Sequence, residues 1–173
     1  KQLQLIDFFE GSFDQTALFT SSAVFEKNVF EQAGNFDTSL KTGEDVDLWI
    51  RIGLLYKIVF SWEIGAQYRE AHNSLSRNNI DYSEKPDFLK YEEFEKNHKF
   101  LSKYLDLNRF SMALKAKSAN QKEQFIRFKN LIRFENLSCK QKILLHMPRS
   151  VLLKIYSLKT FLHKRNIRMS AFK

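Results

Sequence analysis

Three carboxylates, Glu44, Asp45 and Asp47, mark the part of the sequence best suited to acid–base chemistry. They open a segment whose apolar residues recur at helical spacing, so we expect a helix here, capped by Thr42. A carboxylate in the first turn of a helix is held in place and can accept a proton from a hydroxyl group. The same charges can instead stabilise the helix dipole, which favours acids at a helix N-terminus. The residue types alone leave both interpretations open.

The elements expected around these carboxylates are short strands and helices. The apolar stretch 17–25 predicts a buried strand with a polar interruption, and 26–33 predicts a short helix that ends at Gly34. After the carboxylate helix, 58–62 and 64–68 predict two short strands, followed by a polar loop.

From Pro86 onward the pattern is helical and basic. One helix is predicted from 88 to 105, a second from 125 to 135, and a third from about residue 140 that Pro148 interrupts. Residues 1–84 carry 7 Lys and Arg against 13 Asp and Glu, a net charge of −6, whereas residues 85–173 carry 21 against 7, a net charge of +14. We therefore expect two parts with different partners, 1–84 and 85–173.

Composition excludes several classes of protein. Of the 173 residues, 43% are hydrophobic, so the chain can bury a core and is not a disordered chain. A single cysteine excludes an intramolecular disulfide and a thiolate metal cluster. The sequence shows no run of 18 apolar residues, no initiator Met and no signal-peptide layout. We expect a soluble, cytoplasmic chain that is cut from a longer protein.

Five motifs, in this order, resemble the second half of the catalytic domain of bacterial family 2 glycosyltransferases, which have the GT-A fold. They are Thr20-Ser21-Ser22, EKNVFEQAGNFD at 26–37, Thr42 to Arg51, Tyr68-Arg69-Glu70-Ala71-His72 and Ser74-Leu75-Ser76-Arg77. The resemblance implies an α/β but α-rich fragment: part of a GT-A mixed sheet with flanking helices over 1–84, followed by a basic helical C-terminal region. The half that binds the nucleotide is missing, so we expect the fragment alone to be inactive.

The activity implied is inverting transfer of a sugar, of the hexosyl type, from a nucleotide-sugar donor. A carboxylate takes the proton of the acceptor hydroxyl group while that oxygen attacks the anomeric carbon. The resemblance assigns this base role to Asp45, with Glu44 beside it in the catalytic pair. A divalent metal, Mg²⁺ or Mn²⁺, is implied as cofactor, with ligands mainly in the missing half. Asp45-Val46-Asp47 has the Asp-x-Asp pattern, but we do not interpret it as the metal-binding pair of the family, because it lies inside a predicted helix.

The predicted substrate-binding residues are Trp49, Arg51, Arg69 and Arg77, and His72 is the predicted metal ligand. The two loop arginines could neutralise the leaving diphosphate, although ion pairs with nearby acids would explain them equally well. Neutral imidazole suits Mn²⁺ or a phosphate oxygen, but a solvent-facing histidine explains His72 as well. Trp49 falls on the apolar side of its helix, which favours a place in the core over stacking on a sugar.

The basic region has two interpretations, a solvated face over a core stripe or a surface attracted to anionic lipid. The ending MPRSVLLKIYSLKTFLHKRNIRMSAF looks like tails of bacterial enzymes that build surface polysaccharides on lipid-linked acceptors. This favours a peripheral location on the inner face of the plasma membrane and a glycan or lipid-linked acceptor. Nucleic acid is not expected as a partner, because no helix-turn-helix, RNA-recognition or zinc signature accompanies the charge. The alternative is a noncatalytic membrane- or protein-interaction module derived from a glycosyltransferase.

Overall fold

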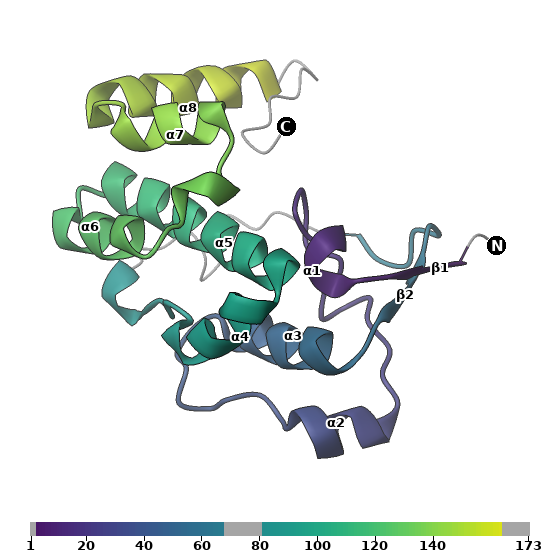
Figure 1. The fold of residues 1–173 in the computed structure, drawn as a ribbon. Coiled ribbons are helices and arrows are strands. Elements are labelled where there is room, and N and C mark those ends of the chain that lie inside the picture. The colour runs from purple at the N-terminus through teal and green to yellow at the C-terminus, as the bar shows by residue number, and fades with distance from the viewer. Residues whose placement is uncertain (1–2, 68–80, 164–173) are drawn as a thin grey trace. The chain divides into compact units, whose positions relative to one another are not determined.

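A computed structural model describes residues 3–67 and 81–163 of the chain (Figure 1). The described residues are mainly helical, with eight α-helices and one sheet of two strands, so the expectation of an α-rich chain is confirmed. The chain divides into two compact units, residues 1–88 and 89–173, and each is described by itself. No helix in the described ranges combines the length and the hydropathy needed to cross a membrane.

The sheet of the first unit joins the start of the chain to its middle. Strand β1, Leu3–Ile6, pairs antiparallel with β2, Ile58–Ser61. The prediction of a strand at 58–62 is confirmed, whereas β1 was not anticipated. The expected strand at 64–68 is wrong for residues 64–67, which have no regular structure, and Tyr68 lies outside the described residues.

Helix α1, Phe8–Gly11, follows β1 and packs on α3, Glu44–Leu55, which is the longest helix of the unit. Asp7 caps α1, because its Oδ1 accepts hydrogen bonds from the backbone N–H groups of Phe9 and Glu10. Phe8 and Phe9 are fully buried. A Cβ atom at Gly53 would lie 2.7 Å from the Phe8 ring, so this glycine lets α1 pack directly on α3.

Helix α2, Lys27–Ala33, and helix α3 are both confirmed, but one predicted cap is wrong. The residue after α2 is Gly34, with a φ of 77° that favours glycine. The N-cap of α3 is Gly43, with a φ of 80°, and the predicted cap Thr42 makes no capping hydrogen bond. The left-handed backbone at Gly43 redirects the chain one residue after Thr42, so the threonine lies outside the cap position.

The predicted strand at 17–25 is wrong, because this stretch consists of turns and irregular backbone. Leu18 is its buried residue. The hydroxyl groups of Thr16 and Ser22 donate to the backbone oxygens of Leu18 and Phe19 respectively. Such local bonds compete with the pairing of a sheet, which explains why an apolar stretch rich in Ser and Thr forms no strand.

The second unit is built around α5, Lys99–Ser118, which contacts α4, α6, α7, α8 and η3. Its other helices are α4 Glu92–Asn97, α6 Lys122–Asn130, α7 Cys139–His146 and α8 Arg149–His163, with the short 3-10 helices η2 Leu89–Tyr91 and η3 Phe134–Asn136. The break at Pro148 is confirmed. The expected continuous helix 88–105 instead divides at His98, whose Nδ1 accepts from the Leu101 N–H and so starts α5. The second predicted helix ends at Asn130.

A buried polar network connects α4, α5 and η3. Both carboxylate oxygens of Glu95 accept from Arg109, at 2.6 and 3.0 Å, and Glu95 also accepts from Arg133 at 3.0 Å. Asp106 accepts from Arg109 at 3.2 Å and from the Asn136 amide at 2.7 Å. Both acids are buried, so each charge has the partners that burial requires.

Candidate active site at the start of helix α3

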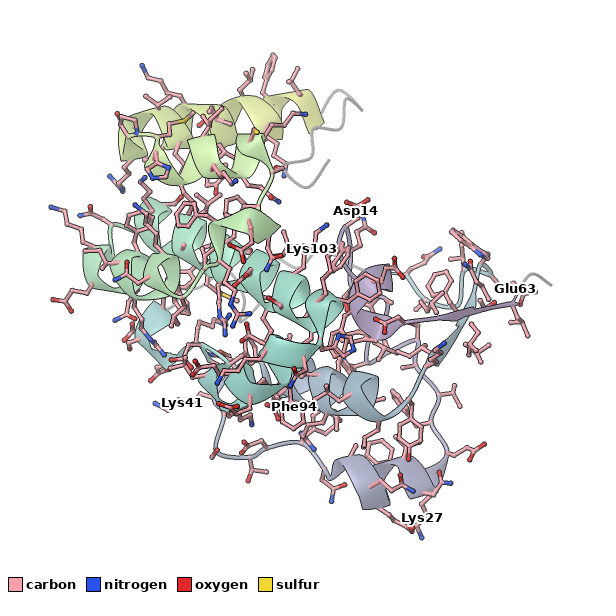
Figure 2. All side chains as sticks on the ribbon, viewed as in Figure 1. Asp14, Lys27, Lys41, Glu63, Phe94 and Lys103 are labelled. Carbon is pink, nitrogen blue, oxygen red and sulfur yellow. The ribbon has the colours of Figure 1, made fainter. Side chains whose placement is uncertain are left out.

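The candidate site is the first turn of α3 with the segment 81–86 beside it. Lys41 pairs with Glu84, and the Lys41 side chain is labelled in Figure 2. A Cβ atom at Gly43 would lie 2.9 Å from Cγ of Pro86. The segment 81–86 thus contacts the chain on both sides of Thr42, directly ahead of the α3 carboxylates.

The segment beside α3 contains the 3-10 helix η1, Tyr82–Glu84. Asp81 caps it by accepting a hydrogen bond from the Ser83 N–H at 2.9 Å, and this bond lowers the pKa of Asp81 below its ordinary value. The hydrogen bond to Glu84 raises the pKa of Lys41. At neutral pH Lys41 and Asp81 are therefore both charged. The pair of Lys41 with Glu84 links the segment 81–86 to the chain ahead of α3.

Asp45 lies in the first turn of α3 and is half-buried. Its Oδ1 accepts a hydrogen bond from the Val46 N–H at 2.7 Å, which orients the carboxylate at the helix start. Glu44, one residue earlier, is also half-buried. An ionised, partly accessible carboxylate in a defined position can accept a proton.

Asp47 has a different environment, because its side chain is buried and forms an ion pair with Arg51. The Asp47 Oδ2 lies 3.1 Å from the Arg51 Nε, and Asp47 has an exposed fraction of 0%. The same guanidinium group donates to the backbone oxygens of Ala33 and Asn35, the latter at 2.7 Å. Arg51 therefore links α3 to the end of α2, and Asp47 is directed to this interior contact.

Trp49 is 3% exposed and belongs to an aromatic cluster. Its ring stacks on Phe25 at a centroid distance of 5.4 Å, and Phe36 approaches it edge-on at 6.3 Å. The structure thus places Trp49 in the core, where it fixes the orientation of α3. The site residues Arg69, His72 and Arg77 lie outside the described residues.

The structure brings to this site several residues that the sequence did not indicate. They are Lys41, Glu84 and Pro86, which belong to no motif. Glu84 and Pro86 lie about forty positions after the residues that they contact. The Thr42 Oγ1 is buried and has no hydrogen-bond partner within the described part of the chain. The local signal available was the Thr-Gly pair ahead of three acids, which indicates a helix start but not its neighbours.

Within residues 3–67 and 81–163, no three His, Cys, Asp or Glu side chains gather as a metal site. The resemblance places the ligands of the implied divalent metal mainly outside this chain, so that cofactor stays a prediction. Within the Asp-x-Asp, the Asp47 carboxylate pairs with Arg51. Comparisons with models of protein families, with curated proteins and with solved structures gave no match to this chain.

Proposed function

We propose that this chain is the acceptor-side part of an inverting, nucleotide-sugar-dependent glycosyltransferase of family 2 with a GT-A fold, in which Asp45 is the general base. One observation carries the proposal: the two neighbouring aspartates have opposite environments. Asp45 is half-buried at the start of α3, whereas Asp47 is buried against Arg51. Of the two, Asp45 is the acid that an acceptor hydroxyl group can reach.

The reaction assigns each group a part. Asp45 takes the proton of the acceptor hydroxyl group as its oxygen forms a bond to the anomeric carbon, and the bond from that carbon to the nucleoside diphosphate breaks with inversion. A general base of this kind contributes roughly 10²–10⁴ to turnover. Glu44 lies one residue earlier in the same helix turn and is assigned no proton transfer. No step is assigned to a metal held by the described residues.

The exposed sheet supports a larger catalytic domain. Leu3, Leu5 and Val59 share one face of the β1–β2 ribbon and are 62–64% exposed. A ribbon of two strands is marginally stable by itself, and an apolar face of this kind normally packs against further structure. The mixed sheet of a GT-A domain is such a structure, and it is where we place the binding of the nucleotide sugar.

Asp45→Asn tests the proposal in a sugar-transferring protein that contains this chain, assayed with a panel of nucleotide sugars and a lipid-linked acceptor. The change keeps the size of the side chain and removes its proton acceptor, so we expect turnover to fall by roughly 10²–10⁴. The melting temperature should change little, because loss of a helix-dipole charge costs only about 0.3–1 kcal/mol. Turnover and melting temperature are measured on the same preparations.

Glu44→Gln is the matched control, because it removes a charge from the same helix turn without removing the assigned base. We expect it to retain most of the turnover. Near-normal turnover in Asp45→Asn would contradict the proposal. So would a Glu44→Gln variant that loses more turnover than Asp45→Asn at equal stability.

A further inference from the structure

Helices α7 and α8 form a strongly basic end of the second unit. Between them they carry five Lys and Arg and no Asp or Glu: Lys140, Lys142, Arg149, Lys154 and Lys159. No acid occurs anywhere in the sequence after Glu135. Two acids of this unit, Glu95 and Asp106, are buried in the polar network. The α7–α8 surface therefore has no acidic side chain of its own to neutralise its lysines.

Helix α8 also presents apolar side chains on its outer face. Val151, Lys154, Leu158 and Phe161 follow one another at intervals of three and four residues, which places them on one side of the helix. The three apolar members are 41, 52 and 51% exposed, whereas Leu152, on the inner side, is fully buried. We call these four residues the outer face of α8. It combines Val, Leu and Phe side chains with a lysine that lies between Val151 and Leu158.

Three basic side chains of this unit outside α7 and α8 make contacts within the unit. Arg133 donates to Glu95 and Ser102, so its charge belongs to the polar network. Lys117 donates to the Leu145 backbone oxygen and lies over the Phe125 ring. Arg127 lies over the Phe128 ring. Helix α6 also carries an acid, Glu123, among its lysines, whereas α7 and α8 carry none.

We propose that the outer face of α8 binds an anionic lipid surface, with the helix lying in the plane of the membrane. Leu158 and Phe161 enter the boundary between headgroups and acyl chains, and Lys154 extends its stem toward the phosphates. Each basic residue near such a surface strengthens binding by about five-fold. A nucleic-acid backbone would match the lysines but leave the apolar residues in water, whereas a lipid surface matches both. This inference is independent of the proposed function.

Flotation of the whole chain with vesicles tests the proposal. One vesicle population is pure phosphatidylcholine and the other an equal mixture of phosphatidylcholine and phosphatidylglycerol. We expect binding to the anionic vesicles only, and weaker binding at high salt, since the screening length falls from about 10 Å at 0.1 M to about 3 Å at 1 M. Equal binding to both populations, or no binding to either, would overturn the proposal. Tight binding to duplex DNA without flotation would also overturn it.

Leu158→Asp locates the contact, and Ile126→Asp is its control. Ile126 lies on α6 and is 54% exposed, so both variants introduce one acid at an equally exposed apolar position. We expect Leu158→Asp to weaken anionic-vesicle binding by at least about five-fold and Ile126→Asp to leave it within two-fold, roughly. An Ile126→Asp variant that is equally impaired would contradict the assignment to α8. Circular dichroism checks that both variants are folded.

A fluorescent reporter provides a second measurement. Cys139 is the single cysteine, so Cys139→Ser gives a cysteine-free background. In it, Leu158→Cys and Ile126→Cys each place one environment-sensitive dye on a chosen helix. We expect the emission of the dye at 158 to shift to shorter wavelength on addition of anionic vesicles, and the emission at 126 to stay unchanged. The opposite pattern would assign the contact to α6 and overturn the proposal.

Discussion

At the scale of single residues, Arg51 shows how a side chain that resembles a ligand contact can serve the fold. Its guanidinium group binds the Asp47 carboxylate and two backbone oxygens at the end of α2. The planar fork of arginine suits several partners at once, which a lysine could not match. The position of α3 relative to α2 therefore depends on this side chain, which is also an ion-pair partner of the buried Asp47.

Arg51→Ala should lower the free energy of unfolding by about 3 kcal/mol, because it removes the Arg51 ion pair from a buried carboxylate. We take the lower end of the range because the Arg51 side chain is 23% exposed. Urea unfolding measures the change, and the exposed Lys57→Ala is the control for loss of one cation. Adding Asp47→Ala should recover part of the loss. An Arg51→Ala protein of unchanged stability but raised KM for the donor would instead favour substrate binding.

At the scale of elements, the start of α3 depends on Gly43. Its positive φ lets the chain enter the helix directly after Thr42, and its lack of a side chain allows Pro86 to approach. The helix then begins with acids at its positive end, where the dipole stabilises them. The position of Asp45 is therefore set by a glycine and by a proline from a distant segment.

Gly43→Ala should lower the free energy of unfolding by about 1–2 kcal/mol through backbone strain at positive φ. The new Cβ would also lie 2.9 Å from Cγ of Pro86 and displace it. Thermal unfolding measures the cost. Gly65→Ala is the matched control, since an added Cβ there meets no atom within 4 Å. Equal costs for the two variants would show that neither strain nor contact with Pro86 matters at position 43.

At the scale of the whole molecule, charge is divided between the two units and also within the second. Residues 1–88 have a net charge of −6 and residues 89–173 a net charge of +14. Inside the basic unit, burial raises the pKa of the Asp106 carboxyl above its ordinary value of 3.8, while hydrogen bonds from Asn136 and the charge of Arg109 oppose the shift. The buried network is therefore sensitive to pH.

The raised pKa of Asp106 determines how the stability of the fold depends on pH. A raised pKa means that the folded state binds the Asp106 proton more tightly than the unfolded state, so stability from this group is greatest at low pH and declines as pH rises through the raised pKa. We expect the unfolding free energy of the wild type minus that of Asp106→Asn to decrease from about pH 4 upward and then level off. Urea unfolding at a series of pH values measures it. Glu123→Gln, an exposed acid outside the network, is the control, and a difference that increases with pH would contradict the prediction.

The elements with local signals could be predicted from the amino-acid sequence. Helix α2 ends at a glycine, α3 begins with acids and an apolar periodicity, and Pro148 separates α7 from α8. Each signal involves residues within a few positions of one another, so neighbouring residues suffice to predict it. The place of Asp45 in the first turn of a helix follows for the same reason.

Which side chains meet depends on the folded structure and could not be predicted from local patterns. The distinction between an accessible Asp45 and a buried Asp47 requires the end of α2 beside α3, and the pairing of β1 with β2 spans more than fifty residues. The network likewise joins Glu95 to Arg133, 38 positions later. Such contacts depend on loop closure and on burial in a shared core, because a buried charge selects its partner by proximity in space. No local pattern of residue types contains that information.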